Sequence, residues 1–103
     1  MIEEVKYLAK KYLSEIISYR RHLHANPELS FQEIQTSKYV QSNLNKIGIH
    51  DIKEMAGTGI VAEIKGINPD KKVVALRADM DALPILEAND VPYCEAVAPD
   101  SLC

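Results

Sequence analysis

The sequence has 103 residues, enough for one domain at most, and its 47% hydrophobic and 26% charged residues are ordinary for a soluble globular protein. Its net charge of -3 and its scattered basic residues exclude the electrostatic footprint of a nucleic-acid-binding protein. No apolar run approaches the ~18 residues of a membrane helix, and the acidic, amphipathic start lacks the pattern of a secretory signal, so we expect a cytoplasmic protein with no nucleic-acid or membrane partner.

Two helices are predicted in the first half of the chain. Apolar side chains recur at helical spacing over residues 2–24, and Pro27 then breaks the pattern because it disfavours the helical region before it. The second helix starts at "SFQE", where Ser30 and Glu33 have the spacing of a capping box. It ends at Gly48, which occupies the position that helices commonly give to a left-handed glycine.

The second half changes to strand-like patterns. "IHDIKEM" and "IVAEIKGI" flank the turn signal "GTG", so we expect a hairpin around Gly57 and Gly59. A third strand, "KVVALRADM", follows the turn "NPDK". The predicted fold class is α/β, with two N-terminal helices packed on a sheet of about three strands.

Three charged residues follow the most hydrophobic strand in the stretch "LRADMDALP". Arg77, Asp79 and Asp81 stand at every second position and therefore share one face of an extended chain. Two carboxylates so close repel each other unless a cation compensates, and both a metal ion and Arg77 qualify. Two interpretations stay open here. Either Arg77 pairs with Asp79 on a solvated strand end, or the strand end is a functional site, although two carboxylates alone are a weak metal signal.

The histidines, the cysteines and one glutamate give weaker signals. His22 and His24 face different directions on a helix and cannot bind one metal ion together. We interpret His24 as a structural residue near a helix C-terminus, and Glu28 as an acidic residue just before the second helix. Cys94 and Cys103 form no CxxC pair, which favours free thiols over a zinc site or a disulfide.

Taken together, several stretches resemble a known family. "YRRHLHANPELSFQEIQTSKYVQSNLNKIGI", "GTGIVAEIKG" and "VVALRADMDALPILE" follow one another in the order and at the spacing found at the N-terminus of metal-dependent aminoacylases and N-acyl-amino-acid amidohydrolases. That family includes hippurate hydrolases and hydrolases of indoleacetyl–amino acid conjugates, with two-zinc carboxypeptidases as more distant relatives. The resemblance runs from about Ser18 to Tyr93 and implies the opening part of a two-zinc peptidase-like catalytic domain. It also implies that the sheet is a partial mixed sheet that needs later strands, so we expect an open edge and self-association.

The resemblance also implies roles for the strand-end residues. Asp81 matches the family's catalytic aspartate, which orients a metal ligand and raises its basicity. Asp79 stands where the wider family has a metal-binding histidine, so we expect it at or near the metal, while Arg77, His24 and Glu28 belong to the structural motif. The implied cofactor is a divalent metal such as zinc or manganese, which lowers the pKa of a bound water and polarises the amide carbonyl of an N-acyl amino acid.

The end of the sequence departs from the family pattern. Family members continue after "PY" into the metal-binding segment "HACGHD", where this sequence reads "CEAVAPDSLC". We therefore expect residues 1–93 to be a partial N-terminal segment of an amidohydrolase catalytic domain and residues 94–103 a divergent tail. Such a fragment should be inactive alone and bind metal weakly. The alternatives are a small non-catalytic interaction module and a non-functional truncated gene product.

Overall fold

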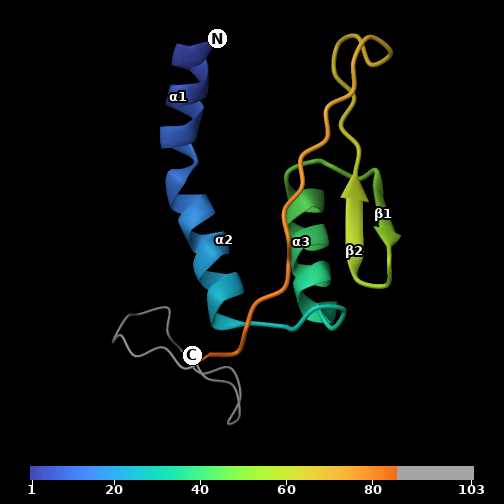
Figure 1. The fold of residues 1–103 in the computed structure, drawn as a ribbon. Coiled ribbons are helices and arrows are strands. Elements are labelled where there is room, and N and C mark those ends of the chain that lie inside the picture. The colour runs from blue at the N-terminus through green and yellow to red at the C-terminus, as the bar shows by residue number, and fades with distance from the viewer. Residues whose placement is uncertain (86–103) are drawn as a thin grey trace. The chain divides into compact units, whose positions relative to one another are not determined.

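The computed structural model describes residues 1–85, which contain three helices and a two-stranded sheet (Figure 1). The described residues divide into two compact units, one made of Met1–Pro27 together with Pro84 and Ile85, the other of Glu28–Leu83. The predictions for Cys94, Cys103 and the tail over residues 94–103 fall outside the described residues.

The first unit contains helix α1 (Ile2–Lys11) and helix α2 (Leu13–Ala25), where the sequence predicts one helix over residues 2–24. Tyr12 separates them with φ -99° and ψ 4°, yet its N–H still donates to the carbonyl of Leu8 at 3.0 Å. The helical spacing thus predicts the extent of the segment but not its interruption. Within residues 1–85, no helix combines the length and the apolar character needed to cross a membrane.

The end of α2 follows the break predicted at Pro27. Asn26 leaves the helical region with φ -126° and ψ 61°, and both its backbone N–H and its side-chain Nδ2 donate to the carbonyl of His22, at 3.1 and 2.8 Å. His24 lies in the last turn of α2, as predicted, where the helix dipole favours a positive charge.

The second unit contains helix α3 (Ile34–Lys46), which starts later than predicted. The predicted capping box is wrong, because Glu33 is the N-cap residue and makes no capping hydrogen bond with its side chain. Phe31 adopts a left-handed φ of 64°, which the interior of a helix excludes. Ser30 and its neighbours therefore form a turn that precedes the helix.

The end of α3 is the predicted glycine stop. Gly48 has φ 96°, and its N–H donates to the carbonyl of Asn45 at 3.1 Å. The N–H of Ile49 reaches back to the carbonyl of Leu44 at 2.9 Å. These two bonds form a Schellman motif, which satisfies carbonyls at the end of the helix that lack a partner within it.

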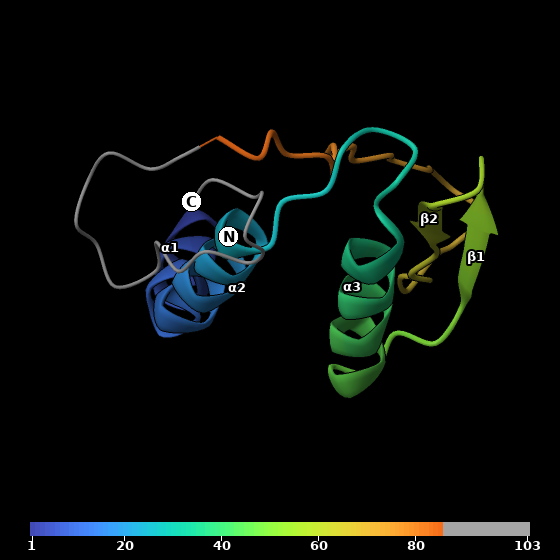
Figure 2. The same ribbon diagram turned by 90° about the horizontal axis from the view of Figure 1, so that it is seen from below.

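The predicted hairpin is confirmed. Strand β1 (Ile52–Met55) pairs antiparallel with strand β2 (Gly59–Ala62), and the register sets Met55 opposite Gly59. In Figures 1 and 2, β2 lies between β1 and α3. Gly57 adopts φ 86°, and a Cβ on Gly59 would lie 2.8 Å from the carbonyl oxygen of Met55, so the tight turn requires glycine at both positions.

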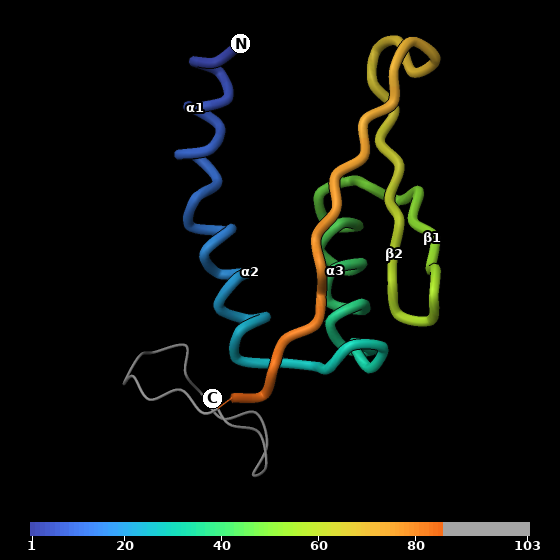
Figure 3. The backbone as a smooth tube through the Cα atoms, viewed as in Figure 1, coloured from blue at the N-terminus to red at the C-terminus, as the bar shows by residue number. Residues whose placement is uncertain are grey.

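The third predicted strand pairs with no other strand among the described residues. Residues 72–80 follow the loop after β2 and run back as extended chain toward the residues that precede α3 (Figure 3). A strand needs partner backbone on at least one edge, and here Val73, Val74 and Leu76 remain 82–97% exposed. The α/β class is confirmed, while the sheet of residues 1–85 is a two-stranded antiparallel hairpin rather than a mixed sheet of three strands.

The most buried side chains of the described residues are polar. Glu33, Thr36, Ser37 and Thr58 are each at most 9% exposed, and every buried polar side-chain atom in residues 1–85 has a hydrogen-bond partner. The first unit, by contrast, exposes the large side chains of Ile2, Val5, Tyr7, Leu8, Tyr12, Leu13, Ile16 and Ile17. The fold therefore leaves much apolar surface in contact with water.

We expect the isolated chain to be marginally stable and to self-associate. Exposed apolar patches beyond a few hundred Å² usually mark an interface or an aggregation-prone surface. Sedimentation velocity and thermal melting by circular dichroism, over a range of protein concentrations, test this expectation. A monomer with a sharp melting transition that does not depend on concentration would instead favour the independent interaction module.

We expect Gly48→Ala to lower the free energy of unfolding by roughly 1–2 kcal/mol, because an L-residue is strained in the left-handed region. An added Cβ at this position meets no atom within 4 Å, so the backbone alone carries the cost. Gly66→Ala is the matched control, since Gly66 also lies in open space but without a positive φ. Urea denaturation should show the control unchanged or stabilised by up to about 1 kcal/mol. Equal effects of the two substitutions would contradict the strain argument.

Candidate functional site

The charged stretch after the third apolar run is extended and faces solvent. Arg77 Nε donates to Asp79 Oδ1 at 3.3 Å, and the two side chains are 91% and 70% exposed. The predicted pairing of Arg77 with Asp79 is therefore present. An exposed ion pair of this kind contributes at most about 1 kcal/mol, so it orients charges more than it stabilises the fold.

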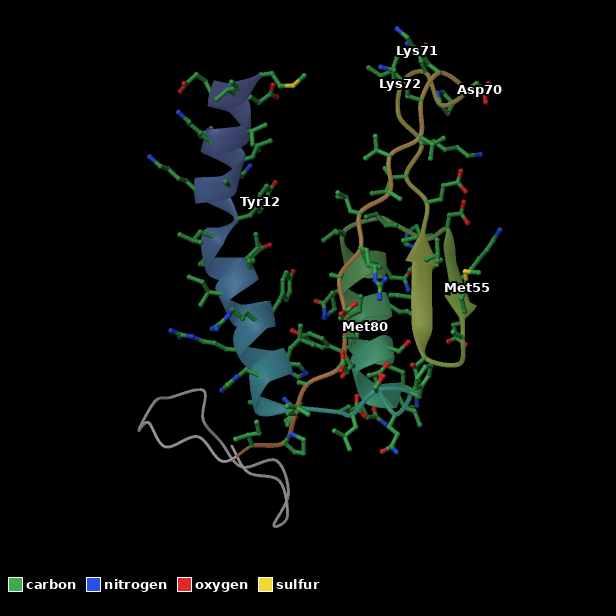
Figure 4. All side chains as sticks on the ribbon, in the orientation of Figure 1. Tyr12, Met55, Asp70, Lys71, Lys72 and Met80 are labelled. Carbon is green, nitrogen blue, oxygen red and sulfur yellow. The ribbon has the colours of Figure 1, made fainter. Side chains whose placement is uncertain are left out.

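Asp81 lies between two half-buried residues, Met80 (labelled in Figure 4) and Ala82. From Asp79 to Leu83 exposed and half-buried residues alternate, as expected for an extended chain. The carboxylates of Asp79 and Asp81 thus emerge on the exposed side. Sequence alternation predicted this arrangement correctly.

The backbone of this stretch is attached to the residues before α3. The N–H of Ala82, the residue after Asp81, donates to the main-chain carbonyl of Glu28 at 2.8 Å. This bond joins positions that are far apart in the sequence. It fixes the end of the charged stretch against the loop that leads into α3.

The side chain of Glu28 caps α3. Its Oε1 accepts hydrogen bonds from the backbone N–H of Thr36 at 2.5 Å and from the Thr36 hydroxyl at 2.6 Å, and its Oε2 accepts one from the N–H of Gln35 at 3.2 Å. These N–H groups belong to the first turn of α3, where the helix itself supplies no acceptor. The carboxylate also meets the positive end of the helix dipole.

These contacts change the acidity of Glu28. Burial by itself raises the pKa of its carboxyl, but the hydrogen bond from the Thr36 hydroxyl, and then those from the Thr36 and Gln35 amides, lower it. The net pKa lies below the ordinary value of 4.5. The carboxylate is therefore the form that the folded chain stabilises.

Glu33 ties α3 to the hairpin. Its Oε2 accepts a hydrogen bond from the hydroxyl of Thr58 at 2.7 Å, and both side chains are buried. Thr58 lies in the "GTG" turn between β1 and β2. Further along α3, the Nε2 of Gln41 lies 3.1 Å from both Ser37 Oγ and Glu54 Oε1, which adds a second link to β1.

Sequence reasoning missed the roles of Glu28 and Glu33. The capping-box pattern assigned Glu33 to the helix start, whereas the acceptor for the first-turn amides is Glu28, eight residues before Thr36. Local capping rules operate over three residues and give no signal at that separation. His24, in the last turn of α2, belongs to the other compact unit.

The described residues do not form a complete metal site. Within residues 1–85, no group of three or more histidine, cysteine, aspartate and glutamate side chains lies close enough to hold a metal ion. Asp79 and Asp81 offer two carboxylates, whereas protein-bound zinc usually has three or four protein ligands. A metal beside these two carboxylates would therefore need ligands from outside residues 1–85.

The second unit joins a helix capped by a distant glutamate to a hairpin and to an extended acidic stretch, and comparison with known proteins relates the chain to a family of hydrolases. No protein-family model matches the chain. It is 46% identical over 91 residues to an N-acyl-L-amino acid amidohydrolase of Geobacillus stearothermophilus, covering 88% of this chain and 24% of that protein. It is also 46% identical over 95 residues to thermostable carboxypeptidase 2 of Saccharolobus solfataricus, covering 90% and 24%.

The fold leads to the same family. A dinuclear metal-binding peptidase of the M20 family from Bacillus subtilis matches 82% of this chain and 23% of its own, with a TM-score of 0.71 and 44% identity. The chain therefore corresponds to the N-terminal segment of the metal-dependent aminoacylase and amidohydrolase family, as its motifs predict. It spans about a quarter of the length of these relatives.

We expect Glu28→Gln to lower the free energy of unfolding at neutral pH by on the order of 1 kcal/mol, the usual effect of losing a helix cap. Because the folded pKa of Glu28 is depressed, its stabilising effect is complete above the unfolded value of about 4.5. It is lost as the pH falls through the lower, folded pKa. Urea denaturation of both proteins should therefore give a difference that shrinks below pH 4.5.

The control for this prediction is Glu63→Gln. The Glu63 side chain is exposed and takes part in no hydrogen bond among residues 1–85, so we expect a change of less than about 0.5 kcal/mol at any pH. A difference between wild type and Glu28→Gln that stays constant from pH 7 down to pH 3 would contradict the capping role of the carboxylate.

Proposed function

We propose that this chain supplies the N-terminal part of the catalytic domain of a metal-dependent amidohydrolase that cleaves the amide bond of N-acyl amino acids. The observation that carries the proposal is the combined match in sequence and fold to amidohydrolases and to a dinuclear metal peptidase. The extended stretch after the third apolar run supports it, because it exposes the carboxylates of Asp79 and Asp81, groups that can bind a metal or orient a metal ligand.

The names of the relatives narrow the substrate class. An amidohydrolase of N-acyl amino acids and a carboxypeptidase both act on an amide whose amine side is an amino acid with a free carboxylate. We infer that the whole enzyme recognises this shared group. The acyl part would then vary from a small acid to a peptide.

We assign Asp81 the role of orienting a metal ligand, and Asp79 a place at or beside the metal. An exposed carboxylate held by its neighbouring backbone can accept a hydrogen bond from a ligating side chain and fix its direction. Arg77 partly neutralises Asp79 and so reduces the repulsion between the two carboxylates. When bound, a divalent ion such as zinc would polarise the amide carbonyl and activate a water molecule.

The decisive test uses a full-length enzyme, made by joining residues 1–93 to the remainder of the Geobacillus stearothermophilus relative. We expect Asp81→Asn to lower its activity or metal affinity by about 10–100-fold, the usual effect of losing a partner that orients a metal ligand. Hydrolysis of N-acetyl amino acids, followed with the metal content of the protein, measures both.

Asp70→Asn is the matched control. Asp70 is also an exposed aspartate, at a loop tip beside Lys71 and Lys72 (Figure 4), and we expect this substitution to leave activity unchanged. Near-normal activity of Asp81→Asn would mean that Asp81 is only a solvated charge at a strand end. An inactive parent enzyme would reject the proposed function itself.

A further inference from the structure

Glu28 contacts two different parts of its compact unit with two different groups. Its carboxylate accepts hydrogen bonds from the first turn of α3, and its main-chain carbonyl accepts the N–H of Ala82. Both sets of contacts lie within the unit Glu28–Leu83.

The bond to Ala82 is the backbone hydrogen bond that joins residues 72–85 to the rest of the described unit. The side-chain bond between Arg77 and Asp79 lies within the stretch and does not attach it to α3. The neighbouring apolar side chains do not hold the segment, because Val73, Val74 and Leu76 are exposed. The position of Asp81 therefore depends on where the Glu28 carbonyl points.

The direction of that carbonyl depends in turn on the Glu28 side chain. Three hydrogen bonds to one carboxylate hold the side chain in one rotamer and so anchor the Glu28 Cα, from which the carbonyl extends. The Thr36 end of this contact is 5% exposed, so little water competes for it. A change at the carboxylate should consequently be felt at Ala82.

We propose that Glu28 is a positioning residue, which uses its capping of α3 to hold Ala82 and thereby sets the place of Asp81. This inference rests on the proposed function only in giving Asp81 a catalytic role. The tie between α3 and the charged stretch is a physical property of the chain and is tested without any activity.

The test is hydrogen–deuterium exchange of the 103-residue chain, followed by mass spectrometry of peptides that cover residues 77–85. We expect one slowly exchanging amide in this range, that of Ala82. Glu28→Gln should speed its exchange roughly tenfold relative to the amides of β2, because local opening becomes easier when the cap is weakened. The ratio to β2 removes any effect of global unfolding.

Matched variants separate this role from a general loss of stability. Thr36→Val removes the hydroxyl that binds Glu28 and should also loosen Ala82, whereas Thr36→Ser keeps the hydroxyl and should restore protection. Gly48→Ala weakens the opposite end of α3 and should leave the ratio of Ala82 to β2 unchanged. If Glu28→Gln abolishes protection in β2, the two Thr36 variants decide the outcome.

Three results would overturn the proposal. They are an Ala82 amide that is unprotected in the wild type, an unchanged exchange ratio of Ala82 to β2 in Glu28→Gln and Thr36→Val, and an equal loss of protection in Gly48→Ala.

In the joined full-length enzyme, Glu28→Gln should lower kcat at least roughly tenfold, because small misplacements of a catalytic group are costly. We expect KM to change by less than about twofold. An unchanged kcat would overturn the positioning role, whereas an inactive parent would reject only the proposed function.

Discussion

The carboxylate of Glu28 at the start of α3 is the contact on which the second compact unit depends. The first amides of a helix have no acceptor within it, and a negative charge is favoured at that end by the helix dipole. Glu28 meets both needs from outside the helix, so the chain between Glu28 and Ile34 has to fold back on itself. That return places the Glu28 carbonyl where Ala82 can bind it, and it leaves Glu33 free to bind Thr58 of the hairpin turn.

In this arrangement, hydrogen bonds between side chains and backbone largely determine how the second unit folds. The four most buried residues in the described part of the chain are polar, and an unpaired buried polar group costs about 1–3 kcal/mol. Because each buried polar side chain would lose this energy without its hydrogen-bond partner, the pairings are well defined. The unit can therefore adopt one structure without a large apolar core. The apolar side chains of α1, α2 and the Val73–Leu76 run contribute little in this state, because they remain exposed. In a longer enzyme, the same side chains would be the natural surface for further strands to cover.

The parts of the fold that the sequence predicts are those with local causes. Pro27 ends α2, Gly48 ends α3, and the glycines of "GTG" close the hairpin, each through a backbone preference of one or two residues. The start of α3 was mispredicted because its first turn is capped by Glu28, a residue too far along the chain for a local capping pattern to identify. The prediction of a third strand is also wrong because it ignores distant contacts. An apolar run becomes a strand only when backbone from another segment lies beside it.

In the candidate site, too, the sequence predicts the features with local causes and misses those that depend on distant contacts. Alternation along an extended chain predicts that Arg77, Asp79 and Asp81 share a side, and the pairing of Arg77 with Asp79 follows from charge. The role proposed for Asp81 came from the family resemblance, because no single-sequence pattern distinguishes it from Asp79. Nor does the sequence contain a local sign that Glu28 holds the segment.

The ion pair also explains why three charges can stand at the end of an apolar run. Two aspartates two residues apart repel each other, and the chain supplies one compensating cation within the stretch. Arg77 binds Asp79 and not Asp81, so within residues 1–85 the Asp81 carboxylate has no ion-pair partner. An unpaired carboxylate of this kind remains able to accept a hydrogen bond from a neighbouring donor, such as the free N–H of a metal-bound histidine. The role proposed for Asp81, to orient a metal ligand, would use this unpaired carboxylate.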